Sequence, residues 1–331
     1  MSATNTDKVK MGALGLVILG LCLFPFMTRP YLVEVAMIFF IWIILVQSYR
    51  LIVTIHDWQL YHVVIYGVGA YTSGMAAKNL GVPVFLAIPL GGVMAALFGF
   101  LITLILLRTT GWSFYIATYG LAELIRLTWV KFRYPFGGST GIISIPYPPV
   151  IAGIDFADSI PYYFFSLVVL LIIMYMLYRI EKSRIGDAFK AISMDPALAQ
   201  STGINIPRHR LLASTIGSFF AGIAGGLLVH RLGAVDPKVF DIHTMLYLLI
   251  WVVVGGTRTY WGPIIGVSVM YTLFEMSRPL IQLRPAFFGL SIIFVLIFMP
   301  GGIESLIYKA VNFWRRRKQT EVPDAAAAGK A

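Results

Sequence analysis

The chain has 331 residues, of which 58% are hydrophobic and only 12% are charged, and its mean hydropathy is +0.81. This composition excludes a water-soluble globular protein and indicates a protein of the lipid bilayer. The net charge of +11 does not call for nucleic acid as a partner, because Lys and Arg gather in the cytoplasmic loops of membrane proteins. Cys22 is the single cysteine, which excludes an intrachain disulfide and a cysteine-based metal cluster.

The N-terminus has the first features of a signal peptide, since Lys8 and Lys10 precede an apolar stretch. A pair of small residues that would mark a cleavage site does not follow it. We therefore interpret residues 11–28 as an uncleaved first span.

Apolar runs recur along the whole chain and predict an all-α polytopic membrane protein with about ten transmembrane segments, since one span takes about 20 residues. Three of the runs are short or rich in glycine, and we expect some of them to be half-helices or re-entrant segments buried in protein. The runs are residues 11–28, 32–54, 60–77, 83–107, 112–130, 161–178, 211–229, 244–255, 263–276 and 286–299, the three short ones being 60–77, 244–255 and 263–276.

The distribution of basic residues predicts the orientation. With ten crossings and the N-terminus inside, the inner segments hold 16 Lys and Arg and the outer segments hold 8. Both termini are therefore predicted to be cytoplasmic. We expect one transmembrane domain over residues 1–305, with a proline-rich outer loop at 131–160 and a charged inner loop at 179–210, followed by a basic, disordered tail at 306–331.

Motifs for catalysis are absent from the sequence. No histidine begins a zinc-binding His-Glu-x-x-His pattern, no phosphate-binding loop occurs, and no nucleophile and base can be paired. We expect no enzymatic activity and no cofactor on this chain. If ATP drives it, another subunit must bind the nucleotide.

Charged residues inside predicted spans are functional candidates because burying them in lipid is expensive. Glu123 and Arg126 are three residues apart on one predicted helix, where they either neutralise each other or line a conduit. Tyr66 and Tyr71, beside glycine-rich sequence, are further candidates for a translocation path. An ion-coupled secondary transporter remains the alternative function, with Glu123 as its coupling carboxylate.

Small residues recur at helical spacing, which favours close packing of helices over a channel lining. They are Gly217, Ala221, Gly222, Gly225 and Gly226 in one run, and Ala95, Ala96 and Gly99 in another.

The inner loop contains an amphipathic pattern. Ile185, Phe189 and Ile192 fall on one face of a predicted helix, while Asp187 and Lys190 lie off that face. Such a helix either lies on the membrane surface or docks into a groove of a cytoplasmic motor protein, and docking is the favoured interpretation.

Several segments of the sequence resemble one family, the LivM-type permeases of branched-chain amino acid ABC importers. The resemblance covers residues 35–305 and includes the inner loop, from Gly186 to Ile192 with Asp195 and the Gly203, Ile204, Asn205 triplet. Six further runs stand in the family's order: GVGAY at 67–71, AELIR at 122–126, GGSTGI at 137–142, FAGIAGG at 220–226, VGG at 254–256 and WGP at 261–263.

The resemblance implies a multi-pass permease subunit of the bacterial inner membrane. Its expected partners are a LivH-like second permease, two cytoplasmic ATPases that bind ATP and Mg²⁺, and a periplasmic solute-binding protein. The expected cargo is a branched-chain amino acid or a related small polar solute. The resemblance also implies an ATPase-coupling role for the inner loop, with Ile185, Gly186, Asp187, Phe189, Lys190, Ile192, Asp195 and Gly203 as its residues.

Overall fold

The computed structural model describes residues 20–109, 111–150, 153–278 and 302–305, and the single helical positions 286, 289–290, 293 and 297. In these parts the protein is mainly helical, and a β-bridge joins Ile142 to Val235. Residues 20–27 form the described part of the first predicted span. The last predicted span, at 286–299, and the predicted tail, at 306–331, lie largely or wholly outside the described residues.

The predicted apolar runs from 32 to 276 all correspond to helices, with ends that differ from the prediction by at most a few residues. These helices are α2 (Pro30–Val53), α3 (His62–Asn79), α4 (Val84–Leu106), α5 (Trp112–Lys131), α6 (Ser159–Glu181), α9 (Ile206–Leu232), α10 (Ile242–Gly255) and α11 (Gly262–Met276). Within the described residues, α2, α4, α6 and α9 are long and apolar enough to cross a membrane. The protein is therefore an all-α, multi-pass membrane protein.

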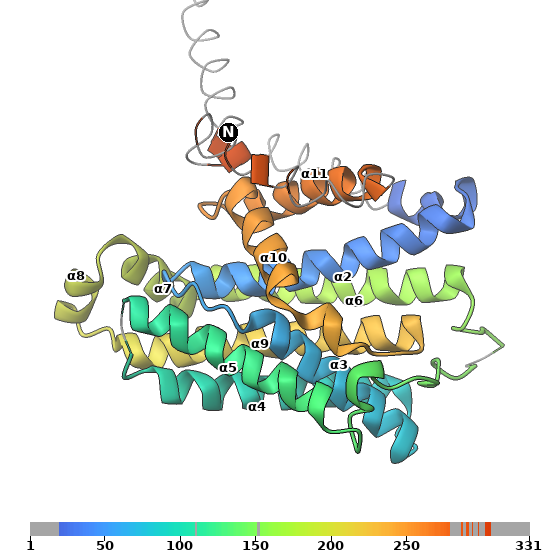
Figure 1. Ribbon diagram of the computed structural model, residues 1–331. Helices are drawn as coiled ribbons and strands as arrows, with labels where there is room; N and C mark the ends of the chain where they lie inside the picture. The colour runs from blue at the N-terminus through green and yellow to red at the C-terminus, as the bar shows by residue number, and fades with distance from the viewer. Residues whose placement is uncertain are drawn as a thin grey trace, which may run out of the picture. The chain divides into compact units, whose positions relative to one another are not determined.

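The chain divides into two compact units, residues 1–245 and 246–331. In the first unit, α9 packs against α2, α3 and α4, and α6 packs against α2 (Figure 1). Asn205 begins α9 by accepting a hydrogen bond from the Arg208 amide at 3.0 Å, and Gly233 ends the helix in a left-handed conformation at φ 66°.

Glycines bring α3, α4 and α9 to backbone contact. A Cβ at Gly69 would lie 2.6 Å from the carbonyl carbon of Gly222, and a Cβ at Gly225 would lie 2.7 Å from the amide nitrogen of Ala70. A Cβ at Gly91 would likewise lie 2.6 Å from the carbonyl oxygen of Gly69. The packing interpretation of the small-residue runs is confirmed, and these three helices leave no space for a path between them at these glycines.

The connections of the first unit gather at two ends. At one end, Asp57 of the α2–α3 connection pairs with Arg210 near the start of α9, and the short helices α7 (Arg184–Met194) and α8 (Pro196–Ser201) lie there as well. At the other end, Glu34 near the start of α2 pairs with Arg231 at the end of α9, and Ser159 of α6 donates to Glu34 at 2.6 Å. Spans that cross the membrane in alternating directions place their connections at alternating ends. The connections of residues 32 to 232 are grouped in this way.

The second unit contains most of α10, from Leu246, and the whole of α11, joined by residues 256–261 as a hairpin. Trp251 packs edge-on against Tyr271 with ring centroids 6.1 Å apart, and a Cβ at Gly255 would lie 2.8 Å from the Cα of Pro263. With 14 and 15 residues, α10 and α11 are about 21 and 22 Å long at 1.5 Å per residue, shorter than a hydrocarbon core of about 30 Å. These lengths agree with the expectation of half-helices or re-entrant segments.

Candidate functional site

The inner loop folds into the two helices α7 and α8, which are joined at a sharp corner. Asp195 forms this corner, since its carboxylate accepts hydrogen bonds from the amides of Ala197 at 2.9 Å and Leu198 at 3.0 Å. Pro196 stands in the first turn of α8, where a missing N–H does no harm. After α8, Gly203 takes a left-handed conformation at φ 87° and lets the chain turn into α9.

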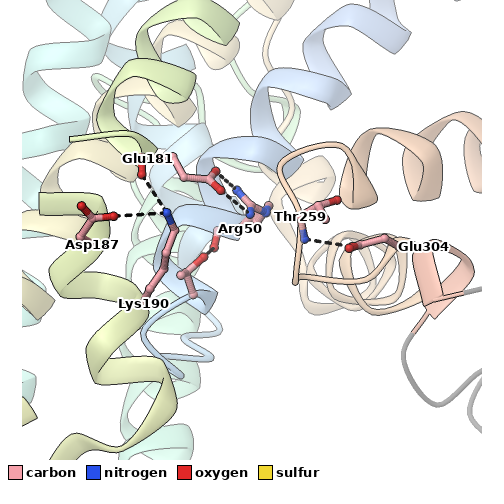
Figure 2. A network of polar contacts seen from close by, with 7 residues as sticks. Arg50, Glu181, Asp187, Lys190, Thr259 and Glu304 are labelled. Atoms are coloured by element: carbon pink, nitrogen blue, oxygen red, sulfur yellow. Dashed lines mark hydrogen bonds and ion pairs between the residues drawn. The ribbon is translucent and has the colours of Figure 1, made fainter. Parts of the chain in front are cut away.

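Polar contacts join α7 to the end of α6, and the end of α6 to α2 (Figure 2). Glu181, the last residue of α6, accepts two hydrogen bonds from Arg50 of α2, at 2.6 and 3.2 Å. The Lys190 ammonium of α7 donates to the carbonyl oxygen of the same Glu181 at 3.2 Å and lies 3.5 Å from Asp187. Arg50 is only 4% exposed, so this contact lies where α2, α6 and α7 meet.

Gly186 permits the close contact between α7 and the end of α6. A Cβ at this position would lie 2.5 Å from the carbonyl carbon of Glu181 and 2.7 Å from its Cα. Any side chain here would therefore push α7 away from the end of α6. Gly186 therefore lets α7 approach α6 of the same chain closely.

The apolar face of α7 is also used inside the protein. Phe189 is 1% exposed and Ile192 is 2% exposed, and the Phe189 ring packs edge-on against His209 with centroids 6.1 Å apart. Ile185 is the one residue of the predicted stripe that lies at the surface, at 36% exposure. Sequence periodicity predicted the buried face correctly, but the surface that it covers belongs to α9 and its surroundings within the same chain.

Other side chains of the loop face outward. Met194 is 86% exposed and Leu198 is 63% exposed, and they stand on either side of the Asp195 corner. Exposed apolar side chains at a polar corner are typical of a contact surface for another protein. The sequence analysis did not select them, because neither lies on the α7 stripe.

The predicted path residues Tyr66 and Tyr71 lie in an aromatic cluster. Tyr71 is 1% exposed and stacks on Trp129 of α5 with ring centroids 4.5 Å apart, and Tyr66 packs edge-on against Phe240 at 5.5 Å. The same Phe240 also meets Trp129 at 5.8 Å. These two tyrosines therefore hold α3, α5 and the 3₁₀ turn Pro237–Phe240 together.

Glu123 and Arg126 form an ion pair on α5, in which the Arg126 Nε donates to the carboxylate at 2.8 Å. Both side chains remain partly exposed, at 29% and 20%. Glu123 also lines a small recess together with Tyr119, Val63 and Asp241. The structure thus brings Glu123 near Asp241 on another element, and Phe240, which packs against Tyr66, lines the same recess.

The exposed part of α5 surrounds this pair. Of its 20 residues, the buried ones are Phe114, Thr118, Ala122 and Trp129. Large apolar side chains such as Ile116, at 72%, and Leu124, at 60%, are open. A helix with one thin buried stripe presents most of its circumference to lipid or to another protein.

Sequence reasoning missed the partners of two charges. Arg50 fell within a predicted span with no assigned partner, and the structure supplies Glu181, which is 131 residues away. Arg231 follows the predicted span at 211–229 with no assigned partner, and the structure pairs it with Glu34. The high cost of a charge inside an apolar run signalled that Arg50 needs a partner, but no local spacing identified which one.

Comparison with known proteins agrees with this architecture. The family described as "Branched-chain amino acid transport system / permease component" matches residues 31–300. The high-affinity branched-chain amino acid transport system permease protein LivM of Escherichia coli is 27% identical over 90% of this chain and 76% of its own length. The LivM protein of Salmonella typhimurium is 26% identical over the same shares.

More distant permeases match shorter parts. The probable branched-chain amino acid transport permease protein LivH of Methanocaldococcus jannaschii is 33% identical over 31% of both chains. The fructose import permease protein FruF of Bifidobacterium longum is 26% identical over 52% of this chain and 50% of its own length. No solved structure matches. These relatives indicate a non-enzymatic transport role in the inner membrane and favour the permease function over the ion-coupled alternative. The match over residues 31–300 shows that the chain belongs to the family of branched-chain amino acid transport permease components.

Proposed function

We propose that this permease is one of two membrane subunits of an ATP-driven importer and that it moves a branched-chain amino acid or a related small polar solute. Its partners are a LivH-like permease, two cytoplasmic ATPases that bind ATP and Mg²⁺, and a periplasmic solute-binding protein. The names of the relatives support the cargo and the second permease. Hydrolysis takes place on the partner ATPases, and this chain converts their movement into a rearrangement of spans.

The observation that carries this proposal is the attachment of α7 to the ends of α2 and α6 through Arg50, Glu181, Lys190 and Gly186. A force applied to the exposed corner at Met194 and Leu198 acts on α7. From there it reaches α2 and α6 through these contacts. We therefore propose the corner, in place of the Phe189 stripe, as the surface that the ATPase holds.

The remaining residues of the inner loop act by shaping this corner. Asp195 caps α8, Gly203 turns the chain into α9, Asp187 sits beside Lys190, and Phe189 and Ile192 seat α7 on the protein. Ile185 lies at the surface next to the attachment.

We place the translocation path along the exposed side of α5, at the interface with the second permease. The Glu123–Arg126 pair supplies polar groups there, and the recess that Glu123 shares with Asp241 opens beside it. Tyr66 and Tyr71 support this surface from behind through Phe240 and Trp129.

Uptake by proteoliposomes tests the proposed function. The complete transporter, reconstituted with external binding protein and internal ATP, is expected to take up radiolabelled leucine, isoleucine or valine. Vanadate abolishes this uptake and an ionophore leaves it unchanged if ATPases drive it. Sensitivity to the ionophore alone would instead support ion coupling through Glu123.

Cysteine labelling tests the orientation. In a Cys22→Ser background, Ser139→Cys and Asp187→Cys are expected to react with an impermeant maleimide from opposite sides, with Asp187 reached from the cytoplasm. Ser139 lies in the 3₁₀ turn Gly138–Thr140, close to the Ile142–Val235 bridge beyond the end of α9, whereas Asp187 lies on α7, which packs against the start of α9. Labelling of both from one side would contradict the proposed arrangement.

A further inference from the structure

A cavity of about 240 Å³ opens at the end of the first unit that holds α7 and α8. Four parts of the chain border it: the α2–α3 connection, the α4–α5 connection with the start of α5, the α7–α8 corner, and the start of α9. Its lining residues are Ile55, His56, Asp57, Thr109, Gly111, Phe114, Tyr115, Ile192, Pro196, Ile206 and Arg210. None of them lines the recess beside Glu123.

One wall of the cavity carries a charge pair. The Arg210 Nη2 donates to Asp57 at 2.9 Å and its Nε donates at 3.3 Å, while the guanidinium carbon lies 5.0 Å from the centre of the Phe114 ring. The Asp57 side chain is 2% exposed and the Arg210 side chain is 21% exposed. The Arg210 Nη1 has no partner among the described residues, so one edge of the guanidinium is free to bind an anion.

The charges of this wall cancel, which restricts the kind of ligand. One guanidinium that is already balanced by one carboxylate does not suit a phosphate with two negative charges. A carboxylate with a single charge fits the free edge better, since Arg recognises carboxylates through paired N–H groups. A ligand that also carries one positive charge keeps the cavity neutral.

The ends of two helices, which favour an ammonium, lie beside the same cavity. Ile55 and His56 follow the C-terminal end of α2, and Thr109 follows the C-terminal end of α4. The carbonyl groups in the last turn of a helix carry partial negative charge and attract cations. The Tyr115 ring offers an aromatic face as well.

The rest of the lining is apolar. Ile55, Ile192, Ile206 and Pro196 supply aliphatic surface from three different parts of the chain, and Phe114 adds an aromatic ring. Small-molecule sites are typically lined in this way, with a few polar groups that fix orientation and an apolar remainder. A branched aliphatic side chain fits such a lining.

From these contacts we infer that the cavity binds a branched-chain amino acid as a zwitterion, with its carboxylate on the free edge of Arg210 and its side chain against Ile55 and Ile192. The inference rests on the proposed function, because it gives the transported solute a second site at the end where the ATPase docks. Ile192 belongs to α7 and Pro196 to α8, so the bound amino acid touches the coupling element directly.

Binding of radiolabelled L-leucine to the full-length permease in phosphatidylcholine nanodiscs, without binding protein, tests the inference. Thr109→Trp adds a large side chain to the lining at a residue outside the Arg210–Asp57 pair, and Arg210→Lys keeps the charge balance while it removes the planar fork. Each is expected to weaken leucine binding by about tenfold or more, the usual effect of losing a charge-assisted hydrogen bond or the space for the ligand. Thr202→Trp is the matched control, since Thr202 is exposed at the same end but lies outside the cavity, and it is expected to bind leucine normally.

Leucinamide, which lacks the carboxylate, is expected not to compete with leucine. Lack of saturable binding, or equal binding by Thr109→Trp and the parent protein, would overturn the inference. Loss of leucine binding in nanodiscs that contain phosphatidylglycerol would assign the cavity to a lipid headgroup and overturn it too. Uptake by the complete transporter is measured separately. Uptake without leucine binding to the cavity rejects the cavity site alone. Leucine binding that depends on Thr109 and Arg210 supports the site even if ATP-driven uptake fails.

Discussion

Replacing Gly186 by alanine is the sharpest test of how α7 is attached. The usual effect of this replacement on helix stability and the effect expected at Gly186 have opposite signs. Replacing glycine by alanine inside a helix normally stabilises it by about 1 kcal/mol. At Gly186 the new methyl group would lie 2.5 Å from the carbonyl carbon of Glu181, whereas an ordinary contact begins at 3.4 Å. Relief requires α7 to move by about 0.9 Å.

The neighbour cannot make this room by rotating a side chain, because all three atoms near the new Cβ belong to the Glu181 backbone. Overpacking of this kind costs about 1–3 kcal/mol, which outweighs the gain in helix propensity. The movement also lengthens the hydrogen bond from Lys190 to the Glu181 carbonyl, now 3.2 Å. We expect Gly186→Ala to destabilise the docked α7 by up to about 2 kcal/mol net.

Hydrogen exchange measures this effect locally. A loss of about 1.4 kcal/mol raises the open population about tenfold, and amides of residues 184–194 should exchange faster by that factor. Gly120→Ala on α5 is the matched control, since a Cβ there meets nothing within 4 Å, and its exchange should be unchanged or slower. Slower exchange around residues 184–194 in Gly186→Ala would refute the attachment described here. Uptake should fall in Gly186→Ala.

Three further predictions concern the same end of the molecule and α5. Phe189→Ala should lower the stability of the permease by about 3–5 kcal/mol, as large-to-small changes in a core do, whereas Met194→Ala should leave thermal unfolding unchanged and weaken retention of the ATPase on co-purification. Glu181→Gln removes the charge facing Arg50, which is 4% exposed, and should cost about 2 kcal/mol or more in thermal or denaturant unfolding; an unfolding curve like that of the parent would contradict a structural pair. Glu123→Gln should reduce uptake with normal assembly, while Tyr71→Ala should reduce the amount of folded permease, and the reverse pattern would place the path at the aromatic cluster.

Much of the helical architecture was predictable because membrane spans are selected by length and apolarity alone. The runs at 83–107 and 161–178 match α4 and α6 closely, and the short helices α10 and α11 were recognisable by their lengths. The packing role of Gly222 and Gly225 was also predictable, since small residues at helical spacing permit close approach.

The candidate site was predictable only in part, because periodicity shows which face of a helix is apolar and does not show what covers it. Phe189 was correctly assigned to a buried face, but the covering surface comes from within the chain. The pairs Arg50–Glu181 and Asp57–Arg210 join residues 131 and 153 positions apart, and no local pattern encodes contacts of that range. The cavity beside Asp57 depends on four chain segments that meet only in the fold.

The backbone contacts among α3, α4 and α9 have a genetic consequence. Every missense change of a glycine codon adds at least a Cβ, and at Gly69, Gly91 and Gly225 even that atom would lie within 2.7 Å of a neighbouring backbone atom. These codons therefore have no mild alternative, and random mutagenesis of the gene should leave them unchanged among functional clones. Gly20, whose Cβ position is open, should accept alanine and serine in the same library. Such a library would outline the rigid part of the permease from sequence data alone.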